Sequence, residues 1–343
     1  MSKSISEVTL RLATRRTVIK TAAVAGLAVP FMPRMAMAQE KKYKLAFSVP
    51  GLNFPFFVHM MDLAKKHVEE KYPDVEFISL DGQENGAPSS TKQSNDIDAI
   101  IAQKVNALVI SPNDVAALAP AVQSAVDAGL VVVTVDRNVT DVKTLAHVGA
   151  DNVEGGRLQG RYLIEILPDG GDIIELQGQP GAAPAIDRHK GLDEILSAQD
   201  KIKVVVSQTA EFARAKAVSV LEAALASNPD PKAVVCANDD MAFGAIEALS
   251  DAGKSGVPIL GFDALPEALQ DIQAGTQAAT VEQFPGGQST QAIDIALAKL
   301  IDGKDPAQHD TYLTPILITK DNLADAERAV EAGVATPVAS PTS

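Results

Sequence analysis

The chain has 343 residues, a length that predicts about two domains. Hydrophobic residues make up 46% of the sequence and charged residues 22%, which excludes an intrinsically disordered chain and leaves enough apolar side chains for sizeable cores. Because 30 Lys and Arg stand against 44 Asp and Glu, the formal net charge is −14, which argues against a nucleic-acid partner.

Residues 1–38 have the composition of an export signal. They contain a single acid, Glu7, and six bases, which are Lys3, Arg11, Arg15, Arg16, Lys20 and Arg34. An apolar run at 21–32 is too short for a stable membrane span and is followed by Ala36-Met37-Ala38, an A-x-A cleavage pattern. Segment 14–20 resembles the twin-arginine export signal. We therefore expect cleavage near Ala38 and a mature protein of net charge −19 in the periplasm.

After the signal, short apolar runs alternate with amphipathic stretches. The apolar runs are rich in β-branched residues and predict buried parallel strands at 44–49, 75–80, 107–110, 130–135, 172–176, 202–206, 233–236 and 258–262. Helices are predicted between them, at 58–70, 90–103, 155–167, 185–196, 214–226, 241–252 and 289–300, with a further helix after Asp114. Repeated β-α-β units predict an α/β protein with doubly wound parallel sheets.

The pattern also predicts how the chain is divided. It is too long for one open sheet and pauses at 146–152, so we expect a crossover between two lobes there. The last residues, 335–343, are rich in Pro, Ser and Thr and predict a disordered tail.

Polar side chains follow several of the predicted strands. Ligands of open parallel sheets bind outside the carboxyl ends of the strands, so these residues are candidates for a binding site. They are Ser111 to Asp114, Asp136-Arg137-Asn138, Asn238-Asp239-Asp240, Asp263 and Gln283. Carboxylates, guanidinium groups and amides together supply donors and acceptors, which suits a ligand covered in hydroxyl groups.

Aromatic residues lie near the same strand ends. Phe54, Phe56 and Phe57 follow the first strand, and Phe212 follows the run at 202–206. Flat aromatic faces can cover the C–H faces of a sugar ring while polar groups bind its edges. Each of these residues also has a possible structural role. A lone Phe is usually part of the core, Arg188 stands among other charged residues as on a solvent-exposed helix face, and Asn238 or Asp239 could cap a helix.

The order of these motifs resembles the periplasmic ribose-binding protein group of type I solute-binding proteins for ABC transporters. The resemblance covers nearly all of the chain after the signal, and its motifs are Leu52-Asn53-Phe54-Pro55-Phe56-Phe57, Asp136-Arg137, Ala150-Asp151-Asn152-Val153 with Gly155-Gly156, Glu175-Leu176-Gln177-Gly178, Asn238-Asp239 with Met241-Ala242, Ala252-Gly253-Lys254-Ser255 and Gly261-Phe262-Asp263.

The resemblance implies the type I periplasmic binding protein fold, two doubly wound parallel-sheet lobes joined by a three-strand hinge. It places an N-terminal lobe at 42–150 plus 284–314 and a C-terminal lobe at 151–283 plus 315–334. It implies that Phe56, Phe57 and Phe212 form two aromatic walls, and that the hydroxyl-binding residues are Asp136, Arg137, Arg188, Asn238, Asp263 and Gln283. The implied partners are a monosaccharide or polyol, the membrane permease of an ABC importer and, as a further candidate, a chemoreceptor, with the protein acting as a monomer.

One site residue departs from the ribose-binding pattern. Phe54 stands where that pattern has an asparagine, so the site has one polar contact fewer and a larger apolar wall. We therefore expect a ligand other than ribose itself, such as another pentose, a deoxy or methyl sugar, or a polyol.

Two other classes of protein share features with this sequence. A sugar-responsive repressor shares the fold but needs a basic helix-turn-helix at the N-terminus, where this chain has an export signal. An exported α/β enzyme acting on a carbohydrate remains the alternative, with Asp136 and Asp263 as its carboxylate pair.

No metal or cofactor is expected. Gly253-Lys254-Ser255 follows a helix rather than a strand and lacks the first glycine of a phosphate loop. The five histidines lack paired ligand spacing, and Cys236 lies inside an apolar run as an inert thiol. The expected mechanism is hinge closure over the ligand without any reaction.

Overall fold

The computed structural model describes residues 41–336. The predicted export signal lies outside the described residues, as does the predicted tail except for residues 335 and 336. The amide of Ala335 donates a hydrogen bond to Ala329 O at 3.1 Å.

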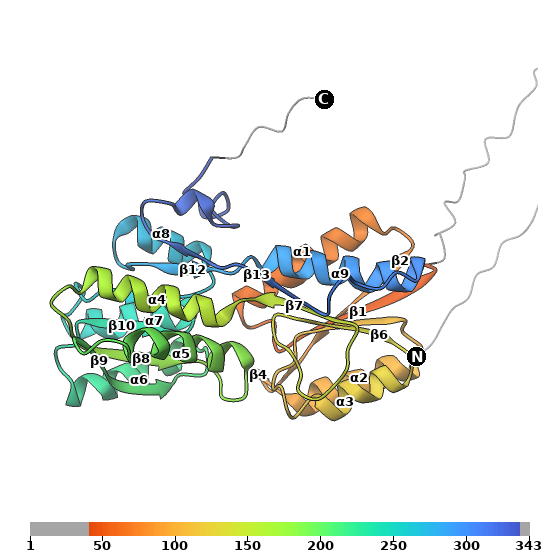
Figure 1. Cartoon of the computed structure of the whole chain (residues 1–343), viewed down its shortest axis with the longest axis horizontal. Helices are drawn as coiled ribbons and strands as arrows, with labels where there is room; N and C mark the ends of the chain where they lie inside the picture. The colour runs from red at the N-terminus through yellow and green to blue at the C-terminus, as the bar shows by residue number, and fades with distance from the viewer. Residues whose placement is uncertain (1–40, 337–343) are drawn as a thin grey trace, which may run out of the picture. The chain divides into compact units, whose positions relative to one another are not determined.

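The first lobe is built on a six-stranded parallel sheet (Figure 1). Its strands, in order across the sheet, are β13 (Asp310–Leu313), β7 (Ala146–Ala150), β6 (Val131–Val135), β5 (Ala107–Ile110), β1 (Tyr43–Val49) and β2 (Val75–Asp81). Helices α1 (Pro55–Lys71) and α9 (Pro285–Asp302) pack together on one face, and α2 (Ser90–Ala102) and α3 (Ala119–Asp127) pack on the other. Because helices cover both faces, the central strand β5 is buried at every residue.

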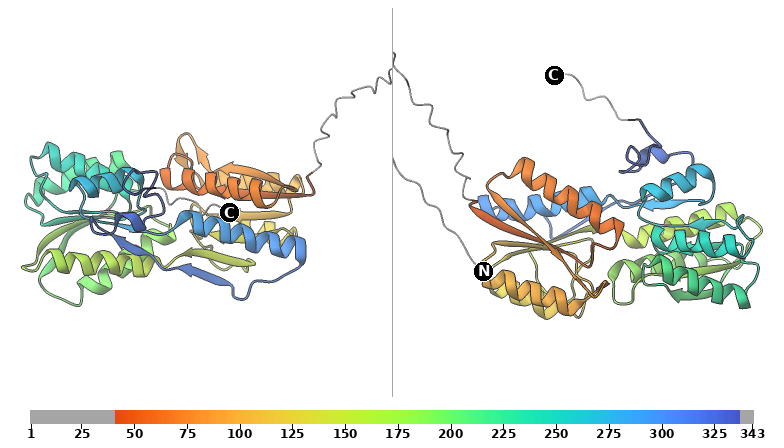
Figure 2. Two further views of the ribbon diagram at one scale, coloured as in Figure 1. Left: turned by 90° about the horizontal axis from the view of Figure 1, so that it is seen from above. Right: turned by 180° about the vertical axis from the view of Figure 1, so that it is seen from behind.

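The second lobe is built on a four-stranded parallel sheet beside the first lobe (Figure 2). Its strands, in order, are β11 (Ile259–Leu260), β10 (Ala233–Cys236), β8 (Gly171–Gln177) and β9 (Ile202–Thr209). Helices α4 (Asn152–Ile166) and α5 (Ala183–Leu196) share a core on one face, and α6 (Arg214–Ser227) and α7 (Asp239–Asp251) pack on the other. The prediction of two parallel sheets in an α/β fold is confirmed.

Smaller elements complete the described residues. Strands β12 (Thr280–Glu282) and β14 (Ile316–Ile318) form an antiparallel pair, and α8 (Pro266–Ala274) shares a core with the 3-10 helix η1 (Leu323–Asp325) and the residues after it. A short hairpin of β3 (Gln83–Glu84) and β4 (Ala87–Pro88) lies after β2.

The chain passes between the lobes three times. Strand β7 belongs to the first sheet, and α4, which follows it after Asp151, packs in the second lobe. Strand β12 leads through Gln283 and Phe284 into α9 of the first lobe, and β13 leads through Thr314 and Pro315 back to β14. Helix α9 therefore returns to the first lobe as expected, whereas the exact lobe bounds given above stay a prediction.

Two strand predictions are wrong in their burial. In strand β2 only Val75 is buried, because β2 is the edge strand of the first sheet and only β1 pairs with it. Strand β9 forms, but most of its residues are exposed, including Val204 and Val205. The reason is that β9 is the edge strand of its sheet and only β8 pairs with it. An apolar run alone does not show whether a strand is central or at an edge.

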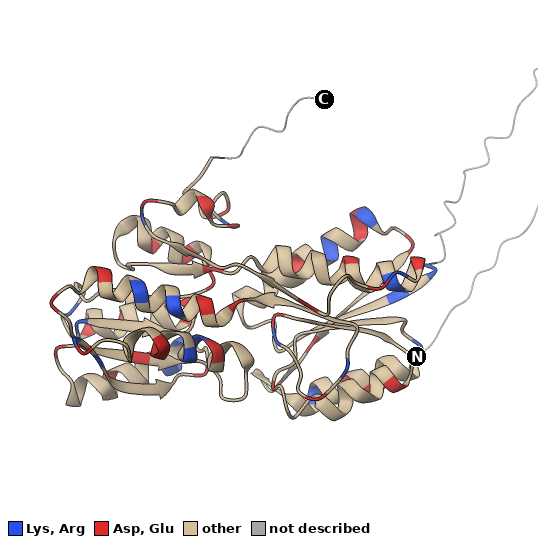
Figure 3. Ribbon diagram, viewed as in Figure 1, with Lys and Arg blue, Asp and Glu red and all other residues tan. Residues whose placement is uncertain are grey.

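Acidic residues are distributed over the helices of both lobes, interspersed with basic ones (Figure 3). None of the helices within residues 41–336 is long and apolar enough to cross a membrane.

Candidate functional site

Three phenylalanines stand at the start of helix α1. Pro55 occupies the first turn, where its missing N–H leaves no intrahelical bond unmade, and Phe54 precedes it in an extended conformation. The rings of Phe54 and Phe57 lie 6.2 Å apart and those of Phe56 and Phe57 lie 5.1 Å apart, both edge to face. All three side chains are buried and form an apolar wall of the first lobe.

Asp136 and Arg137 follow strand β6 at the carboxyl end of the first sheet. The carboxylate of Asp136 accepts a hydrogen bond from Ser111 Oγ at 3.1 Å and lies 3.6 Å from Arg137 Nε. Arg137 Nη1 donates to the carbonyl of Asn113 at 3.0 Å. Its guanidinium carbon lies 5.4 Å from the ring centre of Phe57 and 5.7 Å from that of Phe212 in the other lobe.

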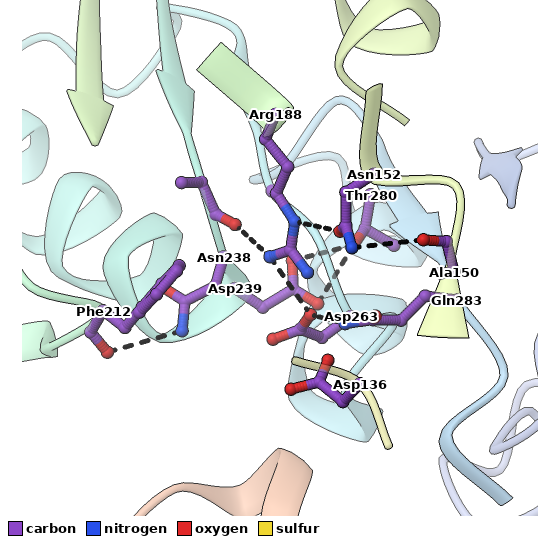
Figure 4. A network of polar contacts seen from close by, with 12 residues as sticks. Asp136, Ala150, Asn152, Arg188, Phe212, Asn238, Asp239, Asp263, Thr280 and Gln283 are labelled. Carbon is purple, nitrogen blue, oxygen red and sulfur yellow. Dashed lines mark hydrogen bonds and ion pairs between the residues drawn. The ribbon is translucent and has the colours of Figure 1, made fainter. Parts of the chain in front are cut away.

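Arg188 projects from helix α5 and is held from several sides (Figure 4). Its Nε donates to Asn152 Oδ1 at 2.8 Å, and its Nη1 donates to the carbonyl of Ala237 at 2.6 Å. Its guanidinium carbon lies 3.6 Å from the ring centre of Phe262. These contacts fix the guanidinium group so that Nη1 lies 3.6 Å from the carboxylate of Asp263.

Asp263 and Gln283 meet at the edge of the second lobe. Gln283 Nε2 donates to Asp263 Oδ1 at 2.6 Å, and both side chains are buried (Figure 4). Asn238 caps helix α7 by accepting a hydrogen bond from the amide of Met241, and its side-chain amide donates to the carbonyl of Phe212. One residue thus begins the helix and also fixes the loop that carries the aromatic ring.

Several of these residues have strained backbones. The φ angle is +60° at Asp136, +60° at Phe212 and +106° at Asp263, a region that L residues rarely adopt. Such conformations concentrate at binding sites, because surrounding structure must hold them.

Burial dominates the electrostatics of the site. Burial raises the pKa of Asp136, and the charges of Arg137 and Arg188 oppose this rise. Burial likewise raises the pKa of Asp263 well above its ordinary value, opposed by Arg188. Burial lowers the pKa of Arg137 to about 10 and lowers that of Arg188. Buried charged groups have lost their hydrogen bonds to water, so a ligand that offers a hydrogen-bond partner to each of them lowers their free energy.

The structure brings all ten predicted site residues around one cavity. A cavity of about 30 Å³ lies between Phe54, Phe56, Phe57, Asp136, Arg137, Arg188, Phe212, Asn238, Asp263 and Gln283. Their binding roles stay a prediction.

Sequence reasoning missed two residues that also line the cavity, Pro184 and Asp240. Asp240 belongs to the polar run after β10, but the sequence does not show which of three adjacent residues faces the cavity. Its neighbour Asp239 is fully buried elsewhere, where it accepts hydrogen bonds from Gln277, Thr280 and the amide of Leu265. Burial raises the pKa of Asp240 to about 6.

Within residues 41–336, no group of His, Cys, Asp and Glu could hold a metal ion. Cys236 is fully buried, and burial raises the pKa of its thiol well above the ordinary value.

Two α/β lobes that enclose a cavity lined from both sides define a two-lobed solute-binding protein. The model of a periplasmic binding protein domain matches residues 45–305. The chain therefore belongs to the periplasmic binding protein family.

Relatives and solved structures agree with this assignment. The ribose import binding protein of Bacillus subtilis is 38% identical over 261 residues, covering 75% of this chain and 83% of the relative. The D-ribose/D-allose-binding protein of Pseudomonas aeruginosa is 33% identical over 308 residues, covering 86% of this chain and 94% of the relative. The Caulobacter myo-inositol binding protein, solved with myo-inositol, superposes with a TM-score of 0.78 at 35% identity, covering 88% of this chain and 99% of that one.

These relatives are binding proteins, so the comparisons give no support to the alternative of an exported enzyme.

Proposed function

We propose that this chain captures a neutral, polyhydroxylated ligand, a pentose-like monosaccharide or a related polyol, and delivers it unchanged to an ABC importer. One observation carries the proposal. Two carboxylates and two guanidinium groups, Asp136, Asp263, Arg137 and Arg188, are buried together between aromatic rings that come from both lobes. Hydroxyl groups both donate and accept, so a polyol can pair with all four charges at once.

The ten cavity residues named above are the proposed ligand contacts. Phe57 and Phe212 cover the ligand's apolar faces, and the charged and amide groups bind its hydroxyl groups. A ligand with one misplaced hydroxyl leaves a buried charge unpaired at a cost of about 1–3 kcal/mol, which gives tenfold or greater discrimination.

Capture proceeds by hinge closure. An open form exposes half of the site on each lobe, and a ligand that contacts both halves has higher affinity for the closed form and shifts the population toward it. The proposed lobes are 42–150 plus 284–314 and 151–283 plus 315–334, joined by the three crossing segments. The protein acts as a monomer, and a chemoreceptor is a second proposed receiver of the closed form. We further propose export by the twin-arginine-type signal, with cleavage near Ala38.

The relatives support the proposed class of ligand. Their names and structures cover ribose, allose, xylitol and myo-inositol, which are all polyhydroxylated and uncharged. Phe54 enlarges the apolar wall of the first lobe, which favours a ligand other than ribose.

A thermal-shift panel tests the proposal. D-ribose, D-allose, L-arabinose, xylitol and myo-inositol are added separately to the mature protein, with sucrose as a control for size. A true ligand at 100 times its Kd adds about 2.7 kcal/mol of stability and raises the melting temperature. No shift with any small sugar or polyol would contradict the proposal, and so would conversion of the bound ligand to a product, followed by NMR.

A further inference from the structure

The loop between β8 and α5 reaches across to the first lobe. The amide of Val115 donates a backbone hydrogen bond to the carbonyl of Gly181 at 3.1 Å, which joins the two lobes directly. A Cβ atom at Gly181 would lie 2.1 Å from Asp114 Oδ2, and the φ angle of +80° also favours glycine. A second glycine in the loop, Gly178, packs under the ring of Phe212. The loop is therefore held between the aromatic wall of its own lobe and the surface of the other.

Gln179 lies in the middle of this loop and contacts the first lobe with both ends of its amide. Its Nε2 donates to Asn113 Oδ1 at 2.7 Å, and its Oε1 accepts from Arg137 Nη1 at 3.5 Å. The same Nη1 donates to the carbonyl of Asn113. Gln179 thus pairs with the guanidinium group of Arg137, a proposed ligand contact, and with the side chain of Asn113. Gln179 itself does not line the ligand cavity.

Asn113, the residue of the first lobe that accepts from Gln179, is held by several hydrogen bonds. Asn113 is buried, its amide nitrogen in the backbone donates to Gln93 Oε1 at 2.7 Å, and its Nδ2 donates to Ser90 Oγ at 3.2 Å. Gln93 is itself fully buried and bonded to Ser48 and to the carbonyl of Ser111. These hydrogen bonds fix the orientation of the Asn113 side-chain amide, so its Oδ1 faces the second lobe and accepts the hydrogen bond from Gln179 Nε2.

We propose that Gln179 is a positioning residue that latches the two lobes in the closed form and holds Arg137 in its ligand-binding orientation. The contact is made by protein groups alone, so it favours closure before a ligand is present. When the ligand is bound, the latch must break before release, so its main effect is on the dissociation rate. The kinetic part of this inference rests on the proposed function, whereas the effect on closure does not.

The kinetic test compares Gln179→Ala with the mature wild-type protein, using the strongest ligand of the panel in stopped-flow titrations. We expect koff to rise by about tenfold, as for loss of a hydrogen bond to a charged group, and kon to rise only in proportion to the open fraction that the variant gains. Asn113→Ala removes the same contact, so the double variant should raise koff hardly more than the larger single effect. The matched control is Gln123→Ala, whose amide bonds only within helix α3, to Asp127. An unchanged koff in Gln179→Ala, or an equal rise in Gln123→Ala, would overturn the proposal.

A second measurement needs no ligand. Spin labels at Asp98→Cys on α2 and Glu222→Cys on α6, both exposed positions on different lobes, report the distance between the lobes. We expect the unliganded wild type to contain a short-distance population that Gln179→Ala reduces. Identical distance distributions would overturn the latch even if a ligand binds. If no ligand of the panel binds, the proposed function fails, and this measurement still decides the latch.

Discussion

The substitution Asp263→Asn separates ligand binding from folding. Asp263 is 5% exposed, and its carboxylate lies 3.6 Å from Arg188 and accepts a hydrogen bond from Gln283. Asparagine has the same shape, tolerates positive φ and still accepts from Gln283, so the backbone at +106° is kept. The variant loses the charged acceptor for a ligand hydroxyl, which costs about 1.5–3 kcal/mol and weakens Kd by about 10- to 150-fold.

The melting temperature of the unliganded variant should not fall. Burial raises the pKa of Asp263 well above its ordinary value, which means that its charge is unfavourable in the folded protein without a ligand. Calorimetric titration gives Kd, and thermal unfolding without ligand gives the stability.

Asp239→Asn is the matched control. Asp239 is fully buried but accepts hydrogen bonds from Thr280, Gln277 and the amide of Leu265 instead of lining the cavity. Both carboxylate oxygens of Asp239 accept from donors, so an asparagine NH2 group would face a donor, and the substitution should lower the melting temperature while leaving Kd unchanged. A Kd unaffected by Asp263→Asn, or weakened equally by both substitutions, would refute this reasoning.

Three further outcomes are expected. Phe54→Asn should raise the affinity for ribose relative to the other ligands of the panel. An unchanged order of affinities would show that the Phe54 side chain does not determine which sugar binds. Burial raises the pKa of Glu282 to about 7, so the folded protein holds this proton longer than the unfolded chain, and stability falls by about 3 kcal/mol as pH rises from about 4.5 to 7. Urea unfolding at several pH values measures the free energy of unfolding, and for Glu282→Gln this free energy should not show the fall that Glu282 causes in the wild type. Parallel plots of unfolding free energy against pH for the wild type and the variant would contradict this prediction. Cys236 should react with a thiol reagent only after unfolding, so prompt labelling of the native protein would argue against its burial.

Polar residues that directly follow predicted strands account for most of the predicted site, because ligands of open parallel sheets bind at the carboxyl ends of the strands. Ligands bind outside the carboxyl ends of parallel strands, which made Asp136 after β6 of the first sheet and Asp263 after β11 of the second sheet candidates, and both line the cavity. The phenylalanines were candidates because they lie near strand ends, but their assignment as aromatic walls, and that of Arg188 as a ligand contact, needed the family resemblance, because a lone Phe or a charged helix residue has more common structural roles.

The sequence could not show which of several adjacent polar residues faces the ligand. Helix α7 begins at Asp239, and consecutive residues of a helix point in directions about 100° apart, so Asp239 is buried in the lobe while Asp240 faces the cavity. Gln179 was missed for another reason. Its partners Asn113 and Arg137 lie in the other lobe, and no local pattern encodes a contact that exists only when the lobes are closed.

Short strands near the C-terminus were also missed. Strands β13 and β14 have four and three residues, and only Thr314 and Pro315 separate them. Their β-structure depends on pairing with β7 and β12, which lie far away in the sequence. Runs this short carry too little periodicity to predict a strand.

Small-angle X-ray scattering with and without the strongest ligand of the panel tests the central claim most directly. The account predicts a larger radius of gyration for the unliganded protein, and a liganded curve that fits the closed lobes described by residues 41–336. Two identical scattering curves at ligand saturation would contradict capture by closure of the two lobes.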